Sequence, residues 1–183
     1  MQAIRFSRRL GGELHMARSG AKRPAIAAAL VKAIAVGLLG GLVATVVLDV
    51  IVVGLFPFIG MPADSSFSVI GDTAARFFSM LDIEMAGGIP LGLLVHYLTG
   101  LSLGGLFGAA RSWHGLGLDS KKNGIGLGIL YTEIISIPIL ATAPIMLQMS
   151  ALGAAQWFGV VFVMHAVYGS VLAFVVSRLQ AKP

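Results

Sequence analysis

Residues 37–49 read GLLGGLVATVVLD, and 87 residues later residues 124–136 read GIGLGILYTEIIS. In both segments small or polar residues recur at every fourth position, so each set lies along one face of a helix. Small residues at this spacing let two helix backbones approach closely inside a membrane. The positions in these two rows are Gly37, Gly41, Thr45 and Asp49, then Gly124, Gly128, Thr132 and Ser136.

A second row begins at a histidine and is also present twice. His96 is followed at four-residue steps by Gly100, Gly104 and Gly108, and 69 residues later His165 is followed by Gly169, Ala173 and Ser177. The two rows come in the same order in both halves of the chain. We therefore predict two parallel copies of a two-helix hairpin, related by a pseudo-twofold axis along the membrane normal.

The composition indicates a membrane protein. Hydrophobic residues make up 57% of the chain and charged residues 11%, whereas soluble domains carry about 25% charged residues. Four apolar segments are long enough to cross a hydrocarbon layer of about 30 Å. We predict an all-α, polytopic fold with spans at residues 33–56, 88–110, 124–147 and 154–177.

The basic residues predict the orientation of the chain. Of the 13 Lys and Arg residues, all except Arg76 lie before or at the start of the first span, between the second and third, or after the fourth. The positive-inside rule makes that side cytoplasmic and places both termini there. The net charge of +5 therefore reflects the orientation of the chain in the membrane. Since the basic residues do not indicate a nucleic-acid-binding surface, we predict no nucleic-acid partner.

The chain divides into an arm and a membrane domain. Residues 1–24 form a basic cytoplasmic arm, expected to be irregular or a short surface helix, within which Met16 is a second candidate initiator. Residues 25–183 form the four-helix domain. In its external loop, residues 65–82 carry apolar side chains at helical spacing after possible caps at Asp64, Ser65 or Ser66. They predict an amphipathic helix at the membrane surface or over the bundle.

Four ionisable residues fall well inside the spans: Asp49, His96, Glu133 and His165. Such groups are costly in hydrocarbon and usually face the bundle interior. We expect Asp49 to pair with His96, and Glu133 with His165. The set allows a proton or ion path, a b-type haem held by His96 and His165, or simple hydrogen bonds across helices. No span contains the Glu-x-x-His of carboxylate-bridged bundles, so no metal site is predicted.

Three short patterns carry a resemblance to a known group. They are Gly37-x-x-x-Gly41-x-x-x-Thr45, the turn from Phe56-Pro57 to Gly60-Met61-Pro62, and His96-x-x-x-Gly100. Together they resemble small bacterial four-helix integral membrane proteins of unknown function, over roughly residues 30–177. The resemblance implies four helices in a bacterial inner membrane, and it supplies no catalytic residues.

These features predict a non-enzymatic protein of the membrane. Its expected role is that of an interaction or accessory subunit, either as a homo-oligomer or within a larger membrane complex, with the lipid bilayer around it. The alternatives are a transporter or channel that uses the four ionisable residues, and a bis-histidine haem protein. Glycine rows used up in helix contacts would favour the accessory role. A polar line continuous to both surfaces would favour transport.

Overall fold

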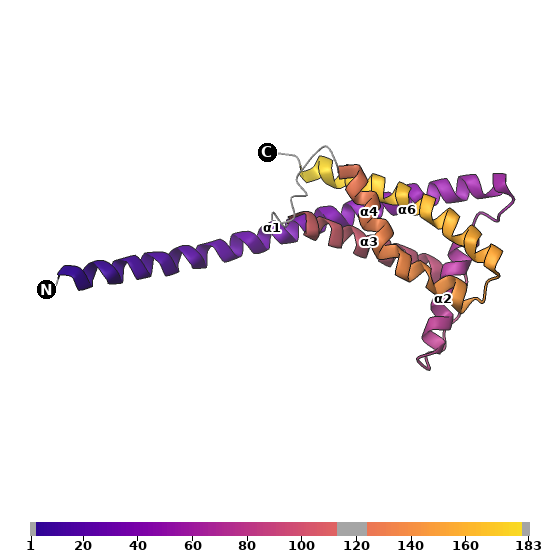
Figure 1. The fold of residues 1–183 in the computed structure, drawn as a ribbon, viewed down its shortest axis with the longest axis horizontal. Helices are drawn as coiled ribbons and strands as arrows, with labels where there is room; N and C mark the ends of the chain where they lie inside the picture. Colours follow the sequence, from indigo (N-terminus) through magenta and orange to yellow (C-terminus); the bar gives the residue numbers. More distant parts are fainter. Residues whose placement is uncertain (1–2, 113–123, 181–183) are drawn as a thin grey trace.

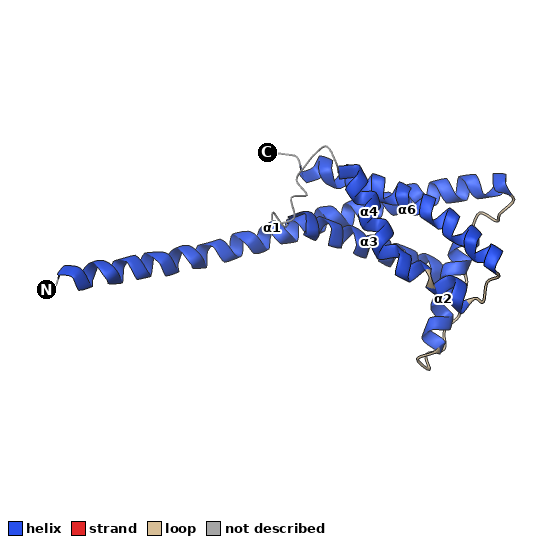
Figure 2. Cartoon of the chain, in the orientation of Figure 1, coloured by secondary structure: helices blue, strands red, loops and turns tan. Residues whose placement is uncertain are grey.

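The computed structural model describes the backbone of residues 3–112 and 124–180, and within these ranges the side chains from residue 26 onward except that of Ile59. Every regular element in these ranges is helical, which confirms the predicted all-α class (Figure 2). In chain order the elements are α1 (Ala3–Leu55), the short 3-10 helix η1 (Phe56–Ile59), α2 (Ser65–Ser79), α3 (Ile89–Ser112), α4 (Gly124–Leu140), α5 (Thr142–Met146) and α6 (Ala151–Gln180).

Four helical segments are long and apolar enough to cross a bilayer, and the chain is a multi-pass membrane protein. They run over residues 26–58, 89–112, 124–146 and 151–180, and each contains or closely matches one predicted span. The shortest has 23 residues, and a transmembrane helix needs about 20. Large apolar side chains such as Val50, Ile134 and Leu152 are exposed on the helix surfaces, as suits groups that face lipid.

The N-terminal arm is part of the first helix. α1 begins at Ala3 and runs unbroken to Leu55, so the expectation of an irregular arm or a short separate helix is wrong. Alanine, arginine and leucine recur in the arm and favour helix. Extending a helix that already exists also costs less than nucleating a new one. Figure 1 shows this part of α1 projecting well beyond the other helices.

The bundle is organised around the membrane part of α1. This helix packs against α3 and, on another side, against α6, while α4 packs chiefly against α6 and touches α3 only slightly. A cluster of buried, mainly apolar residues lies where these helices meet. It comprises Ala44, Leu48, Val52, Phe56, Leu103, Phe107, Tyr168, Leu172, Ala173 and Val176.

Glycines make the closest contacts between α1 and α3. A Cβ atom on Gly37 would collide with the carbonyl oxygen of Gly104, and one on Gly41 would collide with that of Gly100. Gly108 continues the same row, one turn further along α3. The first pair of predicted rows is therefore used to press two backbones together, with no room for a side chain between them.

α4 and α6 meet through the matching residues of the second half. A Cβ atom on Gly128 would collide with the carbonyl oxygen of Gly169, and it would lie 2.6 Å from the Cβ of Ala173. The contact is looser at the start of α4, where a Cβ on Gly124 would lie 3.3 Å from Oγ of Ser177. The second pair of rows is thus also used within the chain.

Two threonines support these contacts in the same way. The hydroxyl of Thr45 donates to the carbonyl oxygen of Gly41 at 2.9 Å, and that of Thr132 donates to Gly128 at 2.8 Å. Both threonines are almost fully buried. Because each hydroxyl bonds to the preceding turn of its own helix, neither leaves an unpaired donor in the apolar contact.

α2 covers one end of the bundle and packs against α3 and α5 (Figure 1). It begins at Ser65 with Asp64 in the N-cap position, as the sequence allows, although the Asp64 side chain makes no capping bond. The helix ends at Ser79, earlier than predicted. Asp82 adopts a left-handed backbone with φ of 58°, a conformation that commonly terminates helices.

The contact between α2 and α3 also depends on glycine. A Cβ atom on Gly71 would collide with the carbonyl oxygen of Gly88, and one on Gly92 with that of Phe67. This contact was not predicted from the sequence. The signal was present, because Gly88 and Gly92 extend the four-residue row of His96 by two more steps toward the start of α3.

Candidate functional site

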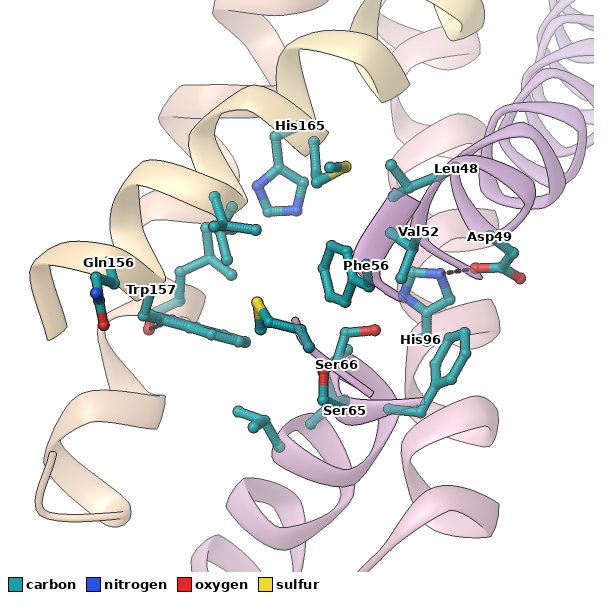
Figure 3. Close-up of a pocket in the computed structure, with 18 of the residues that line it drawn as sticks. Leu48, Asp49, Val52, Phe56, Ser65, Ser66, His96, Gln156, Trp157 and His165 are labelled. Carbon is teal, nitrogen blue, oxygen red and sulfur yellow. Dashed lines mark hydrogen bonds and ion pairs between the residues drawn. The ribbon is translucent and has the colours of Figure 1, made fainter. Parts of the chain in front are cut away.

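A cavity of about 560 Å³ lies at the end of the bundle where α1 stops and α2 begins. Figure 3 shows this cavity, here termed the chamber, between α1, α2, α3 and α6. Its wall is mostly apolar and includes Val52, Phe56 and Met164. The polar side chains that line it are Asp49, Ser65, Ser66, His96, Gln156, Trp157 and His165.

Asp49 and His96 form the predicted pair across α1 and α3. The Nε2 atom of His96 lies 2.9 Å from Oδ1 of Asp49, and both side chains are less than one-fifth exposed, at 18% and 17%. The ring of Phe67 stands edge-on to the His96 ring, with centroids 5.6 Å apart. The pair is therefore held on one wall of the chamber by three helices.

His165 stands on the facing wall, on α6. Figure 3 shows its ring directed from α6 toward the space that separates it from Phe56 and His96. Its Nδ1 atom is buried and has no hydrogen-bond partner among the described residues. A buried polar group without a partner costs about 1–3 kcal/mol, so this imidazole is a group for which a ligand or a water can supply a hydrogen bond.

Glu133 does not join the other three ionisable residues. It is buried on α4, its Oε1 atom has no partner within the described part of the chain, and it is not among the residues that line the chamber. The predicted pair with His165 is therefore wrong. Glu133 precedes Ser136 by three residues, which turns it by about 60° away from the helix face that Ser136 occupies.

Ser136 is the counterpart of Asp49 in the second half of the chain. It occupies the position in α4 that Asp49 occupies in α1, 87 residues earlier. Its Oγ atom is buried and, like Nδ1 of His165, has no partner among the described residues. A serine side chain is shorter than an aspartate side chain, so the second half of the bundle lacks the hydrogen bond that the first half makes.

Trp157 has a more specific role than the interfacial anchor that its position suggests. Its indole nitrogen donates to the carbonyl oxygen of Leu140 at 3.2 Å, and its side chain lines the chamber. In a continuous helix Leu140 would receive a bond from residue 144, but Pro144 has no N–H to donate. The indole fills this vacancy and fixes the start of α6 against the end of α4.

Other long side chains hold the chamber end and the two halves together. Arg76 on α2 donates to the carbonyl oxygen of Met146, at the end of α5, at 2.8 Å. The hydroxyl of Tyr168 donates to Gly100 at 2.5 Å, joining α6 to α3 in the core. Tyr131 donates to Leu103 at 2.7 Å, joining α4 to α3. No sequence pattern indicated these bonds, because each connects residues far apart in the chain.

Arg111 lies away from the chamber, at the last turn of α3. Its guanidinium donates to Oγ of Ser177 on α6 at 2.6 Å, and the residue is only 8% exposed. Ser177 is the counterpart of Gly108 in the second half, and its hydroxyl gives α6 an acceptor for this arginine.

The two histidines of the chamber differ in their hydrogen bonding. Nε2 of His96 is engaged with Asp49, whereas Nδ1 of His165 has no partner among the described residues. A bis-histidine haem held by these two rings stays a prediction. Among the described side chains of residues 26–112 and 124–180, no three His, Asp or Glu side chains gather as a metal site would require.

Comparison with known proteins gives no relative. No protein-family model, curated protein or solved structure matches this chain. The resemblance to small bacterial four-helix membrane proteins therefore stays a prediction. The geometry of the chamber is what bears on function.

Proposed function

We propose that the protein binds a small, uncharged, amphipathic molecule in the chamber and acts without catalysis. One observation carries the proposal. A single cavity with a mainly apolar lining contains both the Asp49–His96 pair and His165, whose Nδ1 atom has no partner among the described residues. Ligand pockets typically combine such a lining with a few polar groups that orient the ligand.

The lining favours a neutral ligand. Among the residues that the structure describes, no Lys or Arg lines the chamber, and the one carboxylate there is paired with His96. An ionised ligand would lose its hydration in this apolar space without gaining a free charge of opposite sign. An uncharged molecule avoids that cost and can enter from the surrounding lipid.

The rest of the bundle supports binding rather than transport. Beyond the chamber, α1 and α3 are in backbone contact at Gly41 and Gly100. The helices there are joined by buried apolar side chains such as Ala44, Leu103 and Leu172. The ionisable residues that face one another gather at one end, so within the described residues they form no polar line to both surfaces.

A ligand-holding bundle also suits an accessory subunit of a larger membrane complex. The glycine rows are used within the chain, so association with another chain or a second copy would use the exposed apolar helix faces, for example around Val50 and Ile134. We further propose that the matching contacts of the two halves reflect a duplicated hairpin. The resemblance to small bacterial membrane proteins implies a bacterial inner-membrane location. The basic residues support an orientation with both termini in the cytoplasm and α2 outside.

Two glycines on α6 allow a matched test of ligand binding. Gly153 lines the chamber, whereas a Cβ on Gly159 would meet nothing within 4 Å. Gly153→Phe should fill the chamber, and Gly159→Phe should add the same ring on an open surface. Native mass spectrometry after mild detergent extraction should detect a bound molecule in the wild type and Gly159→Phe but not in Gly153→Phe. Equal ligand content in all three proteins would contradict the proposal.

A further inference from the structure

We infer that the molecule in the chamber is a lipid-soluble quinone or quinol, which is a planar, neutral ring with oxygen atoms on opposite edges and a hydrocarbon tail. This inference rests on the proposed binding function and names its ligand class. It concerns binding alone and implies no electron transfer. Three features of the chamber carry it, namely the position of its polar groups, the type of its apolar groups and the chemistry of imidazole.

The polar groups stand on two separate walls. His165 projects from α6, whereas His96 and Asp49 belong to α3 and α1, and Figure 3 shows Phe56 in the space between the two groups. Two sites of this kind suit a ligand with polar atoms at two separate places. A quinone ring carries an oxygen on each of two opposite edges, so a ring that lies beside Phe56 can offer one oxygen to each wall. A simple acyl chain has no polar atom for either wall and would leave Nδ1 or Nε2 of His165 unbonded inside the protein.

The apolar side chains that line the chamber are of types that make favourable contacts with a planar ring such as that of a quinone. Phe56, Phe67 and Trp157 line the chamber together with the sulfur-bearing side chains of Met149 and Met164. Aromatic side chains favour stacked or edge-on contact with another ring. Methionine is flexible and polarisable, and it makes favourable contacts with aromatic rings while adapting to their shape. The tail of the ligand needs only apolar contact, which the lining and the lipid both provide.

An imidazole can form a hydrogen bond with either the quinone or the quinol form of such a ligand. One nitrogen of a neutral imidazole donates a hydrogen bond and the other accepts one. His165 can thus donate to a quinone carbonyl or accept from a quinol hydroxyl. His96 is held by Asp49 at 2.9 Å, which fixes the position of its ring and leaves the other edge of the dyad to the ligand.

The chain offers an internal reporter for this ligand. It contains two tryptophans, so Trp113→Phe leaves Trp157, in the chamber wall, as the only indole. Decylbenzoquinone added to this protein in detergent should quench its fluorescence saturably. Decylbenzene has the same tail and a ring without oxygens, and it should compete poorly for the same site. Equal competition by decylbenzene, or quenching that rises linearly without saturation, would overturn the quinone assignment.

Variants of His165 test the hydrogen bond directly. His165→Phe keeps a planar ring without nitrogen and should weaken decylbenzoquinone binding about tenfold, whereas His165→Gln should retain most of the affinity and Gly159→Phe all of it. Unchanged affinity in His165→Phe would remove this residue from the site and with it the inference. If neither His165 variant folds, the quinone assignment is tested by the competition between decylbenzoquinone and decylbenzene in the single-tryptophan protein.

The two proposals fail in different ways. If Gly153→Phe removes a bound molecule but decylbenzoquinone does not bind the wild type, the chamber binds another class of ligand and only the quinone inference is wrong. If no bound molecule is found and decylbenzoquinone also fails to bind, both proposals are wrong. Saturable binding that Gly153→Phe abolishes and Gly159→Phe preserves supports both.

Discussion

The Nε2 atom of His96 lies 2.9 Å from Oδ1 of Asp49 and so joins α3 to α1. His165 lines the same chamber, yet its Nδ1 atom has no partner among the described residues. The two histidines hold matching sequence positions, and the difference follows from Ser136, which stands where the first half has Asp49. Among the described residues, one histidine thus bonds to a neighbouring helix, whereas Nδ1 of the other has no partner.

Asp49 can be tested by two replacements of similar size. Asp49→Asn keeps an oxygen that can accept from His96 and should change stability little. Asp49→Val leaves His96 without its partner in a largely apolar site and should cost about 1–3 kcal/mol. Thermal unfolding in detergent measures both. Equal melting temperatures of the two variants would show that the pair contributes little to the fold.

The helices and their main contacts follow from local sequence rules. Spans are set by long apolar runs, and the four-residue rows around Gly41 and Gly128 correctly indicate which faces lie against other helices. The extent of α1 was not predictable in the same way. The arm lies outside the apolar spans, so its helix depends on propensity and on continuity with the first span.

The site was predictable only in part. The pair of Asp49 and His96 follows from their depth in neighbouring helices of one hairpin. Glu133 was misplaced because depth alone ignores rotation about the helix axis, and Ser136 is the residue on the correct face. The chamber itself depends on how α2 packs over the bundle through Gly71 and on the bond from Trp157 to Leu140, which join segments distant in sequence.

The glycine contacts predict a strong dependence on position. Gly41→Leu and Gly128→Leu would force a side chain into a backbone contact, and each should destabilise the protein by about 1–3 kcal/mol or more. A Cβ atom on Gly54 or Gly126 would meet nothing within 4 Å. Gly54→Leu and Gly126→Leu should therefore melt close to the wild type in detergent. Similar losses in all four variants would refute the contact assignment.

The bond from Trp157 to Leu140 predicts a coupling with Pro144. Trp157→Phe removes the indole donor and should cost about 1 kcal/mol. Pro144→Ala restores an N–H that can bond to Leu140 within the helix. In the Pro144→Ala background the loss caused by Trp157→Phe should then be smaller, and a double-mutant cycle of unfolding free energies measures the difference. Additive effects would mean that Pro144 does not create the need for the indole.

The proposed orientation can be tested with single cysteines because the chain has none of its own. Ser79→Cys, at the exposed end of α2, should react with an impermeant thiol reagent applied to intact cells. Ser120→Cys, between the second and third spans, should react only after the membrane is opened. The charge distribution predicts this pattern, and the reverse pattern would invert the topology.

The final prediction concerns the missing partner of His165. Ser136→Asp would place a carboxylate at the counterpart of Asp49, where it can pair with His165 as Asp49 pairs with His96. We expect the variant to be nearly as stable as the wild type or more stable, because two buried atoms without partners, Oγ of Ser136 and Nδ1 of His165, would be replaced by a hydrogen-bonded pair.

The neighbouring residue supplies the control for this experiment. Ile137 is 52% exposed on the lipid side of α4, and a carboxylate there should cost about 2.5–3.5 kcal/mol. Thermal unfolding in detergent compares Ser136→Asp with Ile137→Asp. If both lose the same stability, position 136 does not face His165. If Ser136→Asp is as stable as the wild type while Ile137→Asp is destabilised, position 136 faces His165.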